Sequence, residues 1–249
     1  MGSATDYNQA YYGELTAGRE NYWQFMPAPR MRIGKILAAM REIDRAVETV
    51  CDFGCGNGAL LREIAGSFPD STLHGIDLSP DQIEQNRQLN PEWRWEQADL
   101  TSDSYSYPFD GACDLAVSSE VIEHLDEPLR YLRNILNSLN PGGTLILTTQ
   151  SGPVHETERH VGHVRHWASD EMTELLNAAG FRNARAYNCG FPFHDLSKWA
   201  ANLNPERVIA RFGQHEWGPF ERATAAALRL LFRFNSSRRG FQLVATASR

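Results

Sequence analysis

The sequence lacks any cysteine pattern of the kind that binds zinc or builds a disulfide framework. Its four cysteines form no CxxC pair. The cysteines are better explained as small buried hydrophobic residues in apolar or glycine-rich segments. The four are Cys51, Cys55, Cys113 and Cys189. We therefore expect reduced thiols and a cytoplasmic location.

Long apolar runs and an excess of positive charge are missing as well. The apolar stretches fall far short of the ~20 residues of a membrane span, and residues 1–10 are polar, so we expect no membrane contact and no signal peptide. The chain has 31 acidic and 24 basic residues, a net charge of -7, which argues against a broad nucleic-acid-binding face. We expect a small-molecule partner, no nucleic acid, and a monomer or homodimer.

The most informative segment is VCDFGCGNGAL, residues 50–60. A short apolar run carries Asp52, and glycines follow at alternate positions, Gly54, Gly56 and Gly58. Glycine lets the backbone approach a ligand closely and adopt positive φ without strain, and a helix start offers unpaired N–H groups to an anionic group. The segment predicts a strand, a tight turn and a helix that together bind a nucleoside-bearing cofactor.

Strand and helix patterns alternate along the 249 residues, which predicts an α/β fold whose sheet is mostly parallel, with helices on both faces. A long connection between the last two strands contains an apolar helix, so we expect an inserted lid or, alternatively, a dimer contact. Expected strands are 47–53, 72–77, 93–98, 114–118, 144–149, 183–188 and 241–247; expected helices include 31–43, 59–67, 128–139, 169–179 and 219–234.

We expect one domain with four parts. Residues 1–45 form an N-terminal lid or helix, 46–190 the cofactor-binding core, 191–239 the inserted lid or cap, and 240–249 the final strand. The first part is rich in aromatic residues, among them Tyr7, Tyr11, Tyr12, Tyr22, Trp23 and Phe25. Local signals include Ser169 as a helix cap and the run Asn140-Pro141-Gly142-Gly143 as a helix stop.

The glycine run alone does not identify the cofactor. It also satisfies the dinucleotide fingerprint G-x-G-x-x-A, which keeps a nicotinamide-dependent oxidoreductase as an alternative. Three acids at the ends of successive expected strands, Asp52, Asp77 and Asp99, favour an adenosine that has a positively charged tail and no phosphates. Asp77 can accept hydrogen bonds from both ribose hydroxyls, and Asp99 can accept one from an exocyclic amine.

Five motifs together resemble the class I S-adenosylmethionine-dependent methyltransferases: VCDFGCGNG, LHGIDLSP, QADL, SSEVIEHLDEP and LNPGGTLILTTQ. The resemblance covers residues 47–181 and the final strand. It implies a Rossmann-like, seven-stranded sheet whose last strand is antiparallel. It also implies S-adenosyl-L-methionine as cofactor and S-adenosyl-L-homocysteine as product.

The resemblance assigns roles to the strand-end residues. Asp52 and the three glycines would hold the amino-acid end of the cofactor, and Glu120 would lie near its methionine end. Asp77 with Leu78 would bind the ribose. Asp99 with Leu100 would face the adenine; the alternatives are that Asp77 only caps a helix and that Asp99 is only a turn residue.

The segment PAPRMR, residues 27–32, is similar to a Pro-x-Arg segment of ubiquinone-pathway O-methyltransferases. There an arginine pairs with the cofactor carboxylate. Arg30 or Arg32 would take that role here, since guanidinium and carboxylate match as a bidentate pair, and we choose Arg30. The alternative is a solvated charge on a helix face.

Histidines supply the candidates for a general base, because their pKa lies near neutrality. His124 in the run EVIEH follows the fourth expected strand at the mouth of the site, where it would act as a base or orient the acceptor. His163, in GHVRHWASDEM, is the second candidate. The other histidines considered are His155, His160, His166 and His194.

On this basis we expect small-molecule methylation, chiefly O-methylation in biosynthetic or secondary metabolism. One alternative remains within methyl transfer, since Glu120, Glu123 and His124 resemble the metal ligands of small-RNA 3′-end methyltransferases. The later histidines do not follow that family's spacing, so we expect no metal. A catalytically silent cofactor-binding protein is the last alternative.

Overall fold

The computed structural model describes residues 25–212 and 217–249. The aromatic residues at positions 7–23, and with them much of the expected N-terminal lid, lie outside the described residues.

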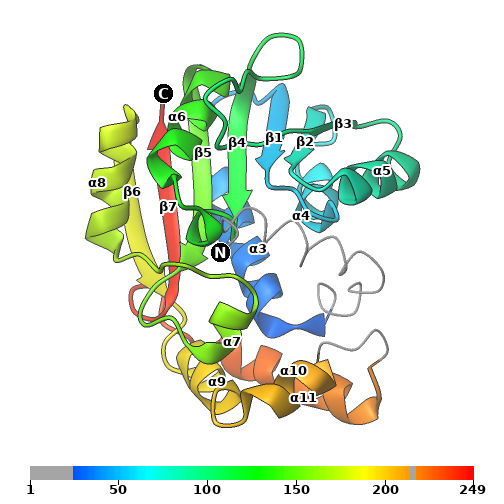
Figure 1. Cartoon of the computed structure of the whole chain (residues 1–249), viewed down its shortest axis with the longest axis vertical. Helices are drawn as coiled ribbons and strands as arrows, with labels where there is room; N and C mark the ends of the chain where they lie inside the picture. The colour runs from blue at the N-terminus through cyan, green and yellow to red at the C-terminus, as the bar shows by residue number, and fades with distance from the viewer. Residues whose placement is uncertain (1–24, 213–216) are drawn as a thin grey trace.

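One seven-stranded sheet forms the centre of the molecule, with strand order β3-β2-β1-β4-β5-β7-β6 (Figure 1). Neighbours from β3 to β5 pair in parallel, and β7 is antiparallel to both β5 and β6, which confirms the expected architecture. The strands are β1 (Thr49–Phe53), β2 (Thr72–Asp77), β3 (Arg94–Gln97), β4 (Cys113–Ser119), β5 (Leu139–Gln150), β6 (Arg182–Cys189) and β7 (Gln242–Ser248).

Helices cover both faces of the sheet and the end at which the parallel strands finish. They are α3 (Pro27–Met40), α4 (Ala59–Ala65), α5 (Pro80–Leu89), α6 (Pro128–Ser138), α7 (Glu156–His160), α8 (Ser169–Ala179), α9 (Phe193–Ala201), α10 (Pro205–Phe212) and α11 (Pro219–Phe232), with the 3-10 turn η1 (Ile122–His124). Among the described residues, none of these helices has the length and apolar character that crossing a membrane requires.

Two hydrophobic cores hold the helices to the sheet, one on each face. Successive residues of a strand point to opposite faces, so β1 serves both cores. Val50 packs with α3, α4 and α5, whereas Cys51 and Phe53 pack with α6 and α8. This explains why the central strands read as continuous apolar runs rather than as alternating patterns.

Three local expectations were wrong. α3 begins at Pro27, since proline suits the first turn of a helix, and it ends at Met40 rather than at residue 43. β5 begins at Leu139, which pairs with Cys113, rather than at residue 144; α6 does end before the predicted helix stop, at Ser138, but the run itself belongs to the strand. Ser169 is the first residue of α8 rather than its cap; the Glu171 carboxylate accepts a hydrogen bond from the backbone N–H of Ala168 at 2.9 Å.

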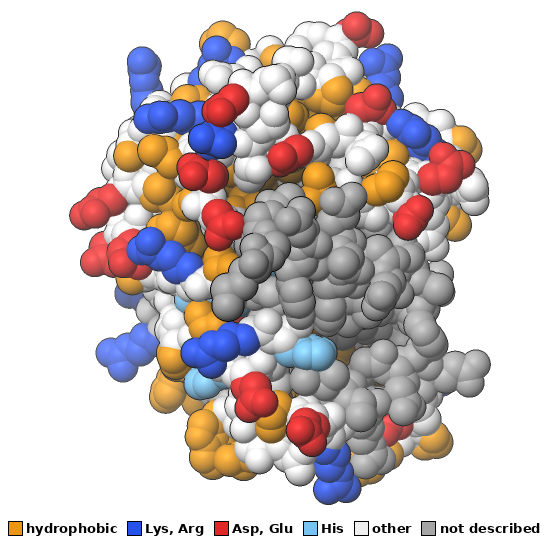
Figure 2. All heavy atoms as spheres, viewed as in Figure 1, with side chains coloured by type: hydrophobic (Ala, Val, Ile, Leu, Met, Phe, Trp, Pro, Cys, Tyr) orange, Lys and Arg blue, Asp and Glu red, His pale blue; other side chains and the backbone are white. Residues whose placement is uncertain are grey.

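The order of strands reverses between β1 and β4, where open α/β sheets form a crevice beyond the carboxyl ends. In Figure 1, α7, α9, α10 and α11 gather beyond that end of the sheet. Acidic and basic side chains are intermixed on the face seen in Figure 2. The fold thus directs attention to the space between the strand ends and these helices.

Candidate active site

A cavity of about 530 Å³ lies at this end of the sheet. Its lining includes the start of α3, the turn after β1, the ends of β2 and β3, the segment after β4, and residues of α7 and α9. Most predicted site residues are in its lining, namely Asp52, Gly54, Gly56, Asp77, Leu78, Asp99, Leu100, Glu120, His124 and His163. Arg30 and Gly58 are not.

The three glycines have different roles, although all have positive φ. A Cβ on Gly54 would lie 2.4 Å from Cγ2 of Val121, and one on Gly58, the N-terminal cap of α4, would lie 2.9 Å from Trp95. At Gly56, with φ +48, none of the described residues places an atom within 4 Å of a Cβ position. Gly56 therefore borders open cavity, whereas the other two allow close packing.

Asp77 fixes the glycine turn and the start of α5. Its Oδ2 accepts a hydrogen bond from the backbone N–H of Gly56 at 2.7 Å, and its Oδ1 accepts one from Ser79 at 2.9 Å. Burial raises the pKa of Asp77, and these hydrogen bonds oppose that shift. A carboxylate offers about four acceptor sites, so the same group can also receive hydroxyl donors from a ligand.

Asp52 is a buried carboxyl group that faces the cavity without a partner for one of its oxygens. It is 2% exposed, and within the described residues its Oδ1 makes no hydrogen bond. Burial, and next the charge of Asp77, raise the pKa of Asp52 to about 8. A cationic ligand group at this position would satisfy the oxygen and favour ionisation.

Asp99 stands in the turn after β3. Its Oδ1 accepts hydrogen bonds from the backbone N–H of Thr101 at 2.8 Å and from the Thr101 hydroxyl at 2.6 Å. Leu100 beside it is buried and lines the cavity. The pair offers one apolar and one acidic group to a ligand.

The arginine at the cavity is Arg32, not Arg30. Arg30 forms an ion pair with Glu63 of α4 outside the cavity. Arg32 is 6% exposed, and its Nε lies 3.7 Å from Oε1 of Glu120. Residues two apart on a helix point in different directions, so the start of α3 at Pro27 determines which arginine faces inward.

Glu120 adopts φ +58 directly after β4, a strained backbone for a non-glycine residue. Its carboxylate accepts hydrogen bonds from the side-chain amides of Gln150 and Gln242, the latter at 2.9 Å. Burial raises its pKa, but the charge of Arg32 and the two amides together hold that pKa below its usual value. Glu120 is therefore a fixed negative charge at the cavity.

His124 and His163 face each other across the cavity wall, with ring centroids 4.7 Å apart in an edge-to-face arrangement. Burial lowers the pKa of His124 to about 4, although hydrogen bonding to the backbone of Gly162 opposes the shift. Burial, and next the neighbouring His124 and His166, lower the pKa of His163 to about 2. Both rings are therefore neutral at physiological pH.

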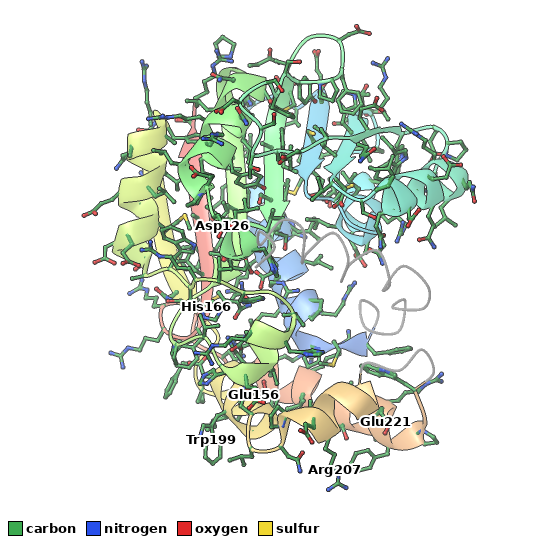
Figure 3. The ribbon with its side chains drawn as sticks, in the orientation of Figure 1. Asp126, Glu156, His166, Trp199, Arg207 and Glu221 are labelled. Carbon is green, nitrogen blue, oxygen red and sulfur yellow. The ribbon has the colours of Figure 1, made fainter. Side chains whose placement is uncertain are left out.

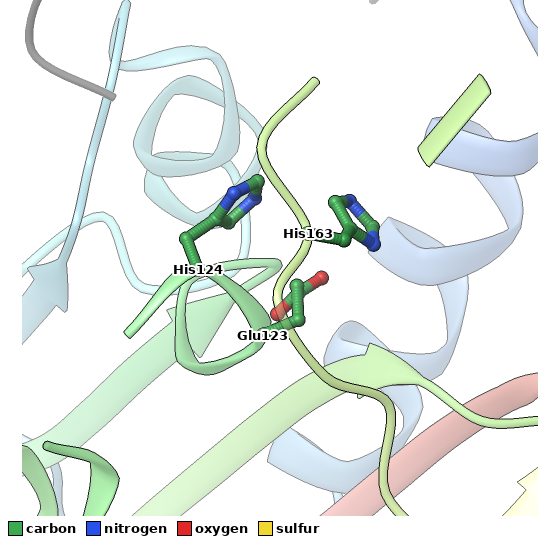
Figure 4. Close-up of side chains that lie close together, drawn as sticks. All are labelled: Glu123, His124 and His163. Atoms are coloured by element: carbon green, nitrogen blue, oxygen red, sulfur yellow. The ribbon is translucent and has the colours of Figure 1, made fainter. Parts of the chain in front are cut away.

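Glu123 lies beside these histidines, as Figure 4 shows. It is fully buried and accepts a hydrogen bond from the Thr149 hydroxyl at 2.7 Å. Burial and the nearby Glu120 charge raise its pKa well above the usual range, which favours the protonated form of Glu123. One ligand atom from each of Glu123, His124 and His163 lies within 4.8 Å of the others, a spacing that would also admit a metal ion.

The inserted helices close the far side of the cavity. Lys198 of α9 pairs with Glu158 of α7 at 2.9 Å and donates a hydrogen bond to Gln150 at 2.8 Å. His194 of the same helix is 2% exposed, lines the cavity and contacts the Asp195 carboxylate at 3.2 Å. Trp199, labelled in Figure 3, points away from the molecule.

Several of these residues could not be found from the sequence. Gln150, Gln242 and Lys198 join segments far apart in the chain, and no motif marks them. Asn86 of α5 likewise donates a hydrogen bond to the carbonyl of Gly56 at 2.7 Å. The sequence offered no signal for Asn86 beyond its being a polar residue after the second expected strand. His155 stands outside the cavity lining, and His160 is part of it.

Comparison with known proteins gives one family. The profile described as "Methyltransferase domain" matches residues 22–186. A trans-aconitate 2-methyltransferase of Pseudomonas paraeruginosa is 28% identical over 133 residues, which are 52% of this chain and 47% of that protein. A malonyl-[acyl-carrier protein] O-methyltransferase of Hahella chejuensis is 27% identical over 186 residues, 70% of this chain and 64% of that protein.

The chain thus spans about half to two thirds of the length of these relatives. Among solved structures, the N-methyltransferase NodS of Bradyrhizobium japonicum, in complex with S-adenosyl-L-homocysteine, aligns with a TM-score of 0.58 at 18% identity and covers 97% of both chains. At that identity the likeness concerns the fold alone.

Proposed function

The chain belongs to the class I S-adenosylmethionine-dependent methyltransferases, and from this premise we propose that it methylates an oxygen atom of a small-molecule acceptor. The reaction fits biosynthetic or secondary metabolism in the cytoplasm. The relatives' names support methyl transfer to small or carrier-bound molecules, and one of them is an O-methyltransferase. We propose that it acts as a monomer or homodimer.

The observation that carries the proposal is the unpartnered Oδ1 of Asp52 in a cavity that Asp77 and Asp99 also line. A cofactor with an ammonium group, ribose hydroxyls and an adenine amine fits these three acids, because each of those groups can donate a hydrogen bond to a carboxylate. Asp52 with Gly54 and Gly56 would hold the amino-acid end. Asp77 would hold the ribose and Asp99 with Leu100 the adenine. A dinucleotide would instead bring two phosphates close to the acids.

Arg32 replaces Arg30 in our proposal as the partner of the cofactor carboxylate, because only Arg32 lines the cavity. When bound, S-adenosylmethionine supplies an activated methyl group on a sulfonium. The protein has to position the acceptor oxygen and receive its proton, and positioning alone can account for much of the rate. His124 and His163 are the neutral bases that line the same cavity.

A metabolite screen tests this function. The protein is incubated with S-adenosylmethionine carrying a labelled methyl group and with small-molecule extracts, and the labelled products are identified by mass spectrometry. We expect a labelled small molecule and one S-adenosylhomocysteine per transfer. Release of neither, with cofactor bound, would refute methyl transfer by this chain.

A further inference from the structure

His166, labelled in Figure 3, is held in a fixed orientation in the segment between α7 and α8. Its Nδ1 lies 3.2 Å from the carbonyl oxygen of Gly152, and its Nε2 lies 2.9 Å from Nδ1 of His163. The ring is buried. The neighbouring backbone is fixed too, because the N–H of Trp167 donates to the carbonyl of Gln150 at 3.1 Å.

These two contacts determine where the protons lie. A carbonyl oxygen only accepts, so Nδ1 of His166 carries a hydrogen and donates it to Gly152. In a neutral ring, Nε2 of His166 is then an acceptor, and Nδ1 of His163 must donate to it. Nε2 of His163 therefore has no hydrogen and presents a lone pair.

Both rings are neutral, as this assignment requires. Burial, and next the charge of Lys198, lower the pKa of His166, while burial and the neighbouring histidines lower that of His163. The charged and titratable groups that face His163 come from four elements: Arg32 from α3, Glu123 and His124 from η1, His166 from its own segment, and Lys198 from α9.

Resting on the methyl transfer proposed above, we propose that His166 is a positioning residue that fixes the tautomer of His163, and that the acceptor group is a hydroxyl. His163 lines the cavity, so its Nε2 lone pair suits a partner that can donate a hydrogen. A hydroxyl donates one, whereas a carboxylate would bring its own lone pairs against that of Nε2. The histidine pair thus selects against carboxylate acceptors.

The acceptor oxygen forms its bond to the methyl carbon while the carbon–sulfur bond breaks and leaves its electron pair on sulfur. The hydroxyl proton passes to Nε2 of His163, and the imidazolium later releases it to water. Because the pKa of His163 is about 2, the proton moves only as methylation makes the oxygen strongly acidic. His163 therefore accepts the proton without ionising the hydroxyl beforehand.

Nuclear magnetic resonance of the ¹⁵N-labelled full chain with S-adenosylhomocysteine tests the tautomer directly. Long-range ¹H–¹⁵N correlations distinguish protonated from unprotonated ring nitrogens, and His163→Gln identifies the signals of His163. We expect an unprotonated Nε2 in the parent protein. His166→Leu, which removes the acceptor, should let the opposite tautomer appear, whereas His166→Gln retains an acceptor oxygen and should preserve the original one.

His160→Leu is the matched control, since His160 lines the same cavity from α7 and should leave the His163 signals unchanged. A hydrogen on Nε2 in the parent protein would overturn the proposal. So would an unaltered tautomer in a folded His166→Leu variant. Neither result would bear on the proposed methyl transfer, because cofactor binding and methyl transfer are measured in separate experiments.

The product of the metabolite screen tests the acceptor class. A methyl ether supports the proposal, and a methyl ester or methylamine overturns it. With the acceptor found, His166→Leu should lower kcat by roughly 10- to 100-fold with little change in cofactor affinity, as losses of orienting partners do, and His166→Gln should restore most of it. Absence of any product counts against the proposed function, and the tautomer measurement then decides the role of His166 alone.

Discussion

The backbone N–H of Gly56 donates to the carboxylate of Asp77 at 2.7 Å. The acid at the end of β2 therefore holds the turn that follows β1 in place, in addition to any contact with a ligand. Asp77 and the glycine turn, which the sequence shows as two separate features, form one unit in the structure. Variants of Asp77 must accordingly be judged on stability and binding together.

Asp77→Ala should weaken S-adenosylhomocysteine binding by roughly 1–3 kcal/mol, the usual cost of leaving buried donors unpaired, and should also lower the melting temperature. Ser79→Ala is the control. It removes the hydroxyl that accepts from Gln82, a cap contribution of about 1 kcal/mol, but keeps the Asp77 carboxylate, so it should weaken binding less than Asp77→Ala although Ser79 also lines the cavity. Calorimetry and thermal unfolding measure both; equal affinities in the two variants would reduce Asp77 to a structural cap.

Gly56→Ala should impair cofactor binding more than folding. The new Cβ meets no atom of residues 25–212 or 217–249 within 4 Å, so we expect the fold to lose only the ~1–2 kcal/mol of a left-handed non-glycine residue. Gly142→Ala is a close match, since Gly142 has φ +78, equally open surroundings and a place outside the cavity lining. We expect similar melting temperatures and a much lower affinity only in Gly56→Ala. Normal binding by that variant would place the ligand elsewhere.

Cofactor binding should release a proton from Asp52. Its raised pKa of about 8 means that the free protein binds this proton at neutral pH, whereas a bound ammonium group favours the carboxylate. Near pH 6.5, where an α-amino group is still charged, titrations in buffers of different ionisation enthalpy should give about one proton released per site. Asp52→Asn should abolish that release, and an unchanged value would assign it to another group.

The raised pKa of Asp52 also affects the stability of the folded protein. Because the folded pKa of Asp52 is raised, the folded state binds the proton more tightly, and stability falls as pH rises from about 4 towards 8. Asp52→Asn removes this penalty, so the ligand-free variant should unfold at a higher temperature than the parent at pH 8. The loss of binding and the gain in stability together would identify Asp52 as a group retained for function.

Elements set by local residues were predictable. β2 occupies residues 72–77 as expected, and α8 occupies 169–179 and ends at Gly180 with φ +107. Long-range partners were not. The two glutamines that hold Glu120 come from β5 and β7, 92 residues apart in the chain. Arg30 and Arg32 were indistinguishable until the start of α3 was known, because that start sets the direction of each side chain.

We expect the enzyme to need no metal. Burial raises the pKa of Glu123, which disfavours the carboxylate that a metal ion requires, and Nδ1 of His163 is committed to His166, which leaves only Nε2 of that ring as a ligand. A chelator should leave methyl transfer unchanged, and dialysed protein should retain no stoichiometric metal by elemental analysis. Activity that disappears with the chelator and returns with Mg²⁺ or Mn²⁺ would restore the metal-dependent alternative, especially if Glu123→Gln cannot be reactivated.

The identity of the cofactor is the central claim, and a calorimetric comparison tests it most directly. S-adenosylhomocysteine and NAD are titrated separately into the full chain under identical conditions. The acids around the cavity predict saturable binding of S-adenosylhomocysteine at one site per chain and no measurable heat from NAD. Tight binding of NAD together with no binding of S-adenosylhomocysteine or S-adenosylmethionine would contradict the account.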